Sequence, residues 1–153
     1  MTPIHAFPYL NLYLHPGPSP AMETHWLGFA TGAEFRAGIL QAMALGREHH
    51  ITGWIADDRL LGAVRPRDLQ WCLDEVLLTL GELGVRRFAL LESQDAMNRR
   101  TIDGMYQQVE PEVSFEIRRF TDLQHARAWA GGGEIAVPLS TCKNSKPRWV
   151  APT

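Results

Sequence analysis

The sequence predicts a mixed α/β fold, in which an N-terminal antiparallel hairpin precedes mostly parallel β-α-β-α-β-α-β units with right-handed crossovers. Two observations support this fold class. Apolar and polar side chains alternate over residues 9–15, which is the period of a half-buried strand. After residue 31, helical stripes of apolar residues alternate with short apolar runs. That order is typical of a parallel sheet whose strands are joined by helices.

The N-terminal hairpin is predicted from two apolar segments and the loop between them. A first strand is expected over residues 9–15 and a second over residues 22–29. The loop contains Pro16, Pro18 and Pro20, which cannot donate to a strand ladder and so force a turn. Because this loop is short, the two strands most easily pair antiparallel.

The first helix is predicted to begin after Thr31 and to run to about residue 50. Thr31 and Glu34 fit a capping box, in which each side chain accepts a backbone N–H at the start of the helix. Phe35, Ile39 and Met43 follow at helical spacing and give the helix one apolar face.

A central strand and a second helix are predicted next. Residues 51–56 form a short apolar run that suits a buried strand. Pro66 fits the first turn of a helix, because the N–H that proline lacks would be unpaired there. The apolar stripe of this helix continues to Leu80, and Gly84 suits a left-handed residue just past its end.

The last predicted elements complete the alternation. We expect a buried strand over residues 88–91, a helix over residues 94–108 and an edge strand over residues 113–118. Thr121 and Gln124 predict a second capping box before a short final helix.

Composition favours one soluble domain. The chain has 153 residues, of which 45% are hydrophobic and 21% charged. No apolar run approaches the ~20 residues that span a bilayer, and the first residues lack the pattern of a signal peptide. Cys72 and Cys142 are too few for a disulfide scaffold. We therefore expect a cytoplasmic protein without a membrane span.

Charge disfavours nucleic acid as a partner. The formal net charge is −2, whereas nucleic-acid-binding domains are usually basic. The chain contains three arginine pairs, at residues 86–87, 99–100 and 118–119. Neighbours on a strand face opposite sides, so a pair on a strand divides its charge between the two faces of the sheet.

The chain divides into a folded part and a tail. We expect a single domain over residues 1–130 and a Gly/Pro-rich, weakly basic tail over residues 131–153. The tail begins with three glycines and carries three basic residues against one acidic residue. A segment of this composition buries little apolar surface.

An ordered set of short motifs runs through residues 9–129. The motifs are HWLGF at 25–29, AEFR at 33–36, WIADDR at 54–59, PRDLQW at 66–71, RRFA at 86–89, and RFTD at 119–122 followed by Ala126 and Trp129. This set resembles small bacterial STAS-like proteins, which are relatives of the anti-sigma-factor antagonists. Some such proteins are grouped with the CRAL-TRIO lipid-binding fold. The resemblance implies a STAS-like domain with a regulatory or protein-binding role.

The sequence departs from the regulatory members of that family at one position. Those proteins carry a phosphorylatable Ser or Thr after the central strand, at the start of the next helix. Residues 53–78 of this chain contain neither Ser nor Thr. The resemblance therefore implies a domain without the usual phosphoswitch. One hypothesis is that Asp57 or Asp58 supplies a fixed negative charge in its place.

Three predicted loops follow the carboxyl ends of strands, where ligands of open α/β sheets tend to bind. Their polar residues are Thr31 in the first loop, Asp57, Asp58 and Arg59 in the second, and Ser93 in the third. One interpretation is a polar surface that binds a ligand or a protein. The alternative is that Thr31 and Ser93 only cap helices, while Asp58 pairs with Arg59 or with the backbone.

Trp71 is a further candidate for an interaction site. It lies beside the apolar stripe of the second predicted helix. An exposed Trp71 close to Asp58 would suit a protein-binding hot spot. The alternative is that Trp71 packs between the helix and a loop.

No catalytic or metal-binding pattern emerges from the sequence. His49 and His50 are adjacent, so on a helix their side chains diverge by about 100° and chelate one ion poorly. Cys72 falls on an apolar stripe and is expected to be a buried small hydrophobe. The chain lacks Cys-x-x-Cys, Gly-x-Ser-x-Gly and Gly-rich phosphate-loop motifs. We expect no cofactor, no metal and no enzymatic activity.

The function that these observations favour is a non-enzymatic STAS-like domain. It would bind an unknown protein partner or form a homodimer, through the loop of Asp57, Asp58 and Arg59 and the start of the following helix. The alternative is a carrier for a small apolar ligand or lipid, which an apolar pocket between sheet and helices would favour. A third hypothesis is an enzyme that uses one of these aspartates together with a histidine.

Overall fold

Six strands form one mixed sheet whose spatial order is also the order of the sequence. The computed structural model describes residues 1–133. Strands β1, β2 and β3 pair antiparallel, whereas β3, β4, β5 and β6 pair parallel. The strands are β1 (His5–Phe7), β2 (Leu10–His15), β3 (Ala21–Trp26), β4 (Gly53–Asp57), β5 (Arg87–Leu91) and β6 (Glu116–Phe120).

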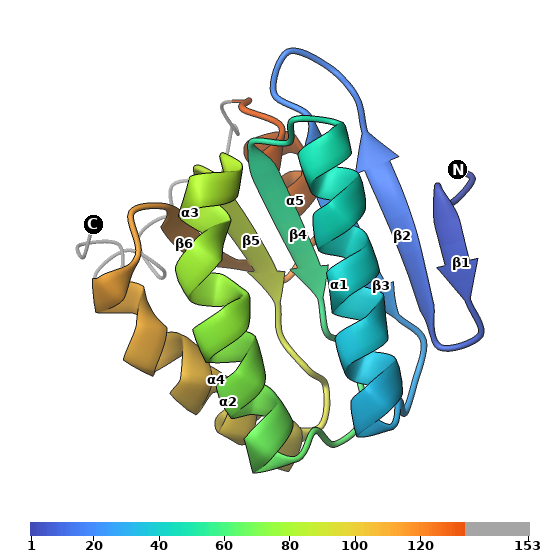
Figure 1. The fold of residues 1–153 in the computed structure, drawn as a ribbon, viewed down its shortest axis with the longest axis vertical. Helices are drawn as coiled ribbons and strands as arrows, with labels where there is room; N and C mark the ends of the chain where they lie inside the picture. Colours follow the sequence, from blue (N-terminus) through green and yellow to red (C-terminus); the bar gives the residue numbers. More distant parts are fainter. Residues whose placement is uncertain (134–153) are drawn as a thin grey trace.

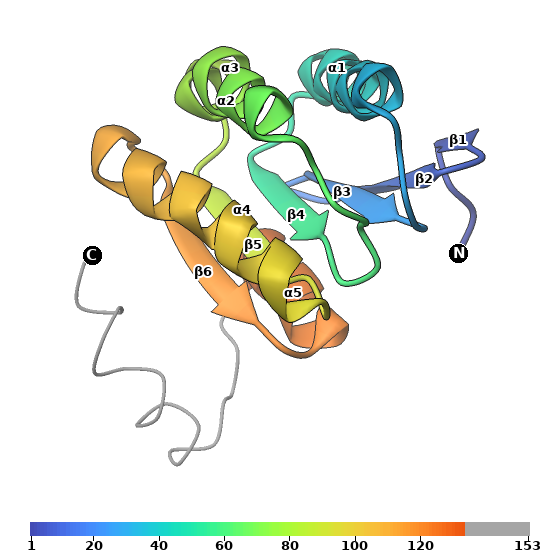
Figure 2. The ribbon, with the colours of Figure 1, turned by 90° about the horizontal axis from the view of Figure 1, so that it is seen from below.

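Helices cover both faces of this sheet (Figure 1). The helices α1, α2 and α4 pack on one face and α5 packs on the other (Figure 2). The three connections between parallel strands therefore cross over on the same face, and all have the same hand. The helices are α1 (Gly32–Glu48), α2 (Pro66–Glu75), η1 (Leu77–Thr79), α3 (Leu80–Leu83), α4 (Ala96–Val109), η2 (Glu110–Glu112) and α5 (Leu123–Ala130). None of these helices in residues 1–133 is long and apolar enough to cross a membrane.

Strand alternation divides the core into two clusters. On β4, Trp54 and Ala56 belong to the cluster beneath α1, α2 and α4, whereas Ile55 belongs to the cluster beneath α5. On β5, Phe88 and Ala89 divide in the same way. The cluster beneath α1, α2 and α4 is the larger of the two, and it surrounds the candidate site.

The main elements of the sequence prediction are confirmed. The N-terminal hairpin, the parallel strands and the order of the helices lie where the periodicity placed them. The Thr31 capping box is present, with Glu34 N–H donating to the Thr31 hydroxyl at 3.2 Å and Thr31 N–H donating to the Glu34 carboxylate at 2.9 Å. Gly84 ends α3 with a φ of 117°, in the left-handed region that glycine tolerates.

The second predicted helix is interrupted. It was expected to run from Pro66 to about Leu80, but α2 ends at Glu75 and a short 3₁₀ turn precedes α3. The Thr79 hydroxyl donates to the carbonyls of Glu75 and Val76, at 3.2 and 2.9 Å. A side chain that bonds to helix carbonyls in this way competes with the regular backbone ladder.

Three further details differ from the prediction. The short strand β1 was not expected, because three residues show no periodicity. The last strand begins at Glu116 rather than at residue 113, because the chain bends at residues 114–115 after the 3₁₀ turn η2. The final helix is capped by Asp122, whose carboxylate accepts from Gln124 N–H at 3.4 Å, so the predicted Thr121 capping box is wrong. The predicted tail lies outside the described residues from residue 134 onward.

Two glycine substitutions test this packing. A Cβ on Gly53 would collide with the carbonyl oxygen of Ala130 in α5, whereas a Cβ on Gly104 in the exposed face of α4 would meet nothing within 4 Å. We expect Gly53→Ala to lower the free energy of unfolding by about 2 kcal/mol. Gly104→Ala should raise it by about 1 kcal/mol through helix propensity. Urea unfolding followed by circular dichroism measures both, and equal effects would contradict the close approach of α5 to β4.

Candidate functional site

Three loops meet at the carboxyl ends of β3, β4 and β5. They are tied by hydrogen bonds from Gly62 N–H to the Gly28 carbonyl at 3.2 Å and from Gln94 N–H to the Arg59 carbonyl at 3.0 Å. The buried Asn98 amide donates to the Leu61 and Gly62 carbonyls at 2.9 and 3.0 Å. The loops that the sequence predicted to meet therefore form one connected rim over the sheet.

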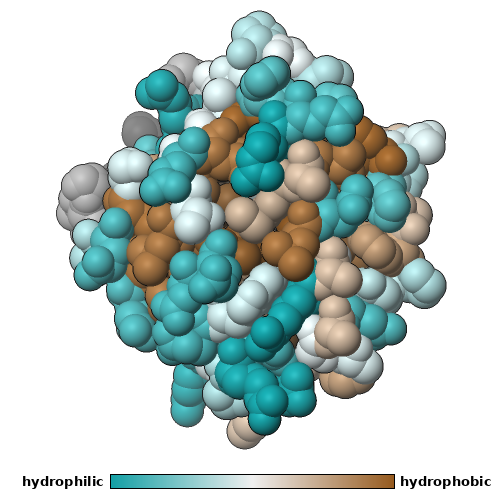
Figure 3. Space-filling model, in the orientation of Figure 1, coloured by the Kyte–Doolittle hydropathy of each residue, from teal (hydrophilic) through white to brown (hydrophobic). Residues whose placement is uncertain are grey.

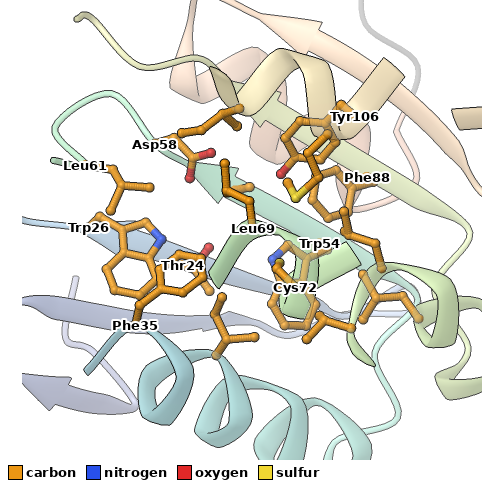
Figure 4. Close-up of a pocket in the computed structure, with 17 residues that line it drawn as sticks. Thr24, Trp26, Phe35, Trp54, Asp58, Leu61, Leu69, Cys72, Phe88 and Tyr106 are labelled. Atoms are coloured by element: carbon orange, nitrogen blue, oxygen red, sulfur yellow. The ribbon is translucent and has the colours of Figure 1, made fainter. Parts of the chain in front are cut away.

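A cavity lies beneath this rim, between the sheet and the helices α1, α2 and α4 (Figure 4). Its volume is about 40 Å³, counted as the space open to the centre of a water molecule. One water molecule needs at least about 10–15 Å³ by this measure. Its lining is mostly aliphatic and aromatic. Hydrophobic side chains also gather near the middle of the face that α1 and α2 cover, with hydrophilic ones around them (Figure 3).

Asp58 directs its carboxyl group into this cavity (Figure 4). The residue is only 5% exposed, and no group of residues 1–133 hydrogen-bonds to its carboxyl oxygens, which are not fully closed off from solvent. Its backbone is fixed, because its N–H donates to the Leu91 carbonyl at 2.9 Å and its carbonyl accepts from Leu61 N–H at 3.1 Å. Burial, with smaller contributions from the charges of Asp57 and Glu92, raises the pKa of Asp58 to about 7.

The other polar groups in the cavity are uncharged. Burial raises the pKa of the Cys72 thiol to about 12 and moves the pKa of Tyr106 well above its ordinary value. Thr24 donates its hydroxyl to the Ile55 carbonyl at 3.4 Å. The indole nitrogens of Trp26 and Trp54 complete the set in Figure 4. Asp58 is thus the one group of the described lining that can carry a charge near neutral pH.

Asp57 faces the opposite side of the sheet and is fully paired. Both of its oxygens accept from the Arg59 guanidinium at 2.9 Å, and His25 Nδ1 lies 2.9 Å from Oδ2. Burial works against ionisation, but the hydrogen bonds and charge of Arg59 outweigh it, so the pKa of Asp57 is lowered. Arg59 therefore pairs with Asp57, whereas the sequence had left open a pairing with Asp58.

The remaining predicted site residues do not line the cavity. Thr31 caps α1, as the simpler interpretation held. Ser93 is buried, and its oxygen accepts from Asp95 N–H at 3.2 Å, while Asp95 itself caps α4. Trp71 packs on α1, with its ring 6.5 Å from that of Phe35 and 5.1 Å from the Arg36 guanidinium carbon. Of the six residues proposed from the sequence, only Asp58 faces the cavity.

Three residues at or near the site were not predicted from the sequence. Tyr106 belongs to the apolar face of α4, where an aromatic residue is indistinguishable from ordinary core. Thr24 occupies a core-facing position of β3, and a polar residue there was an available signal. Glu23 is buried on the opposite face, where Arg127 donates to it at 2.7 and 3.0 Å and His15 Nε2 lies 2.7 Å away. That network needs contacts between residues distant in sequence.

Comparisons with known proteins assign this chain to no family. No protein-family model matches the chain, and no curated protein matches it. A similar solved structure is that of an uncharacterized protein from the DUF3478 family with a SpoIIAA-like fold, from Shewanella loihica PV-4. It is 14% identical, and the superposition covers 83% of this chain and 98% of that chain with a TM-score of 0.49. The family of this chain stays a prediction.

The adjacent aspartates should affect stability with opposite signs. Because the pKa of Asp58 is raised in the folded state, its contribution to stability is complete below about pH 4 and is lost as pH rises to about 7. Asp58→Asn abolishes this pH-dependent loss of stability, so the variant should become more stable relative to wild type over that pH range, by up to about 4 kcal/mol.

Asp57 has a lowered pKa and stabilises the fold above about pH 4. Asp57→Asn should therefore cost about 3 kcal/mol at pH 7.

Urea unfolding of wild type and both variants between pH 4.5 and pH 8 measures this difference. The Asp57→Asn variant serves as the matched control, since it changes the same group one residue away. An Asp58→Asn protein that is less stable than wild type at pH 8 would contradict the assignment of a buried acid whose ionisation destabilises the fold.

Proposed function

We propose that this chain is a non-enzymatic STAS-like domain that binds a small, largely apolar molecule in the cavity beneath α1, α2 and α4. The observation that supports the proposal is the carboxyl group of Asp58, which faces an apolar cavity without a partner among the described residues. A mostly apolar pocket with a few convergent polar groups is the usual form of a small-molecule site. The small volume limits the ligand to a few heavy atoms unless the helices move apart.

The chemistry of the cavity supports binding rather than turnover. A nucleophilic cysteine needs a lowered pKa, whereas the pKa of Cys72 is raised to about 12. Among residues 1–133, no three His, Cys, Asp or Glu side chains gather closely enough to hold a metal ion. His25, which Asp57 orients, lies on the other face of the sheet from the cavity.

Native mass spectrometry tests this proposal, together with a variant that fills the cavity. Ala56 lines the cavity and is buried, so Ala56→Val should remove space for a ligand. Ala128→Val makes the same change on the exposed face of α5 and serves as the control. We expect wild type and the control, purified without denaturation, to retain a small molecule that Ala56→Val lacks. Equal retention by all three proteins, or by none, would contradict binding in the cavity.

A second candidate function is protein binding or self-association through the rim. Three apolar side chains of its loops are exposed: Leu27 by 39%, Phe29 by 68% and Leu60 by 50%. Met97, in the first turn of α4, is exposed by 79%. Apolar groups on two connected loops and on the adjoining start of α4 are typical of an interaction surface. The sequence predicted an interaction surface centred on Asp57, Asp58 and Arg59. Because Asp57 and Asp58 are buried, the contacts with a partner would come from their exposed apolar neighbours.

Sedimentation velocity over a range of concentrations tests self-association. If the rim forms a homodimer, Phe29→Ser combined with Leu60→Ser should lower the dimer fraction about tenfold or more, because the contact loses two apolar anchors. Leu40→Ser removes a similarly exposed leucine, 52%, from α1 and should leave the dimer fraction unchanged. A wild-type protein that stays monomeric throughout would contradict the homodimer.

A further inference from the structure

We propose that the cavity selects a small alkylammonium ion, whose charge pairs with the Asp58 carboxylate while the surrounding aromatic rings enclose its N–H and C–H groups. This inference rests on the proposed function, because it names the chemical class of the ligand for the same cavity. Three features of the described residues support it.

The first feature is the charge of the lining. Among the 17 described residues that line the cavity, Asp58 is the only acid, and none is Lys, Arg or His. A ligand bearing a carboxylate or phosphate would find no cation there. A ligand bearing an ammonium group finds one carboxylate, which the fold has largely withdrawn from water. The free-energy cost of burying that acid is incurred when the protein folds, so the ligand does not add it again on forming the ion pair.

The second feature is the charge around Asp58 outside the cavity. Asp57 and Glu92 lie close enough for their charges to act on Asp58. The nearby guanidinium groups are already engaged. Arg59 pairs with Asp57 at 2.9 Å, and Arg119 lies 2.7 Å from Asp103 and 3.4 Å from Glu92.

Arg99 also lies near Asp58, since both line a small neighbouring cleft. Its guanidinium donates to the Ser93 carbonyl at 2.9 Å. Asp57 and Glu92 are thus balanced by Arg59 and Arg119, and the Arg99 guanidinium bonds to a carbonyl rather than to Asp58. Of these three carboxylates, Asp58 is the one that no arginine of residues 1–133 pairs with, and it is left to meet a ligand.

The third feature is the aromatic enclosure. Trp26 is stacked between Phe35 and Tyr9, with ring centroids 5.4 and 6.4 Å away, and Phe88 lies against Tyr106 at 5.6 Å and stacks on Phe115 at 5.9 Å. The pairs Trp26–Phe35 and Phe88–Tyr106 line the cavity together with Trp54, and Figure 4 shows the two pairs on opposite sides of it. The face of an aromatic ring is electronegative and attracts cations, most strongly in sites shielded from water. Stacking covers the faces of Trp26, so this attraction would come from Trp54 and Tyr106, which have no stacked partner among residues 1–133. An aliphatic ligand of the same size would gain the apolar contacts but not this attraction.

Three ligands of equal length test the inference: butylammonium, 1-butanol and butyrate. Their binding is measured by isothermal titration calorimetry at pH 8, where Asp58 is mostly ionised. We expect butylammonium to bind about tenfold or more tightly than 1-butanol, and butyrate to bind weakest. Asp58→Asn should lower the affinity for butylammonium about tenfold and change that for 1-butanol by less than about threefold. Ala56→Val should weaken the binding of both.

The outcomes separate the inference from the proposed function. Equal binding of butylammonium and 1-butanol, or tightest binding of butyrate, would overturn the inference and leave a small-molecule cavity standing. Binding of none of the three to wild type would overturn both. If Asp58→Asn does not fold, the order of the three affinities in wild type still tests the inference. Tyr106→Phe keeps the aromatic ring, so this variant should still bind butylammonium more tightly than 1-butanol.

Discussion

The pairing of Asp57 with Arg59 is the interaction on which the rest of the site depends. Asp57 ends the central strand β4, and two guanidinium nitrogens and His25 hold its carboxylate on the face that α5 covers. Consecutive residues of a strand point to opposite faces. With Asp57 anchored on one side, Asp58 is directed to the other side, into the apolar layer beneath α1, α2 and α4. The position of the unpaired acid thus follows from the paired one.

Buried carboxylates have different surroundings on the two faces of the sheet. On the face of α5, Glu23 and Asp57 each contact one arginine and one histidine, and the pKa of each is lowered. On the other face, Asp58 has no such partner in the described residues, and burial raises its pKa to about 7. An unpaired acid in a core lowers stability near neutral pH. Natural sequences depart from consistent packing chiefly at functional sites, which is why this residue is the centre of our proposal.

The rim connects the cavity to the surface. The loop that carries Asp58 also carries the exposed Leu60, and Asn98 binds the carbonyls of the next two residues. The interior and exterior candidates for function therefore share one short segment, held by hydrogen bonds to α4. Ligand binding and protein binding make different demands on it. The first needs the Asp58 carboxyl group and the space around it, whereas the second needs the apolar side chains outside.

Local signals in the sequence determined the alternation of strands and helices, the Thr31 cap and the left-handed Gly84, because each depends on residues within a few positions of one another. The sequence also placed Asp58 in a loop at the carboxyl end of a strand, where sites are common. Only the tertiary structure decided that Asp57 takes Arg59 and that Asp58 remains alone beside Tyr106 and the indoles. Those facts depend on which face each side chain meets and on contacts between distant elements. Periodicity gives the face of a strand, but it does not give what packs against that face.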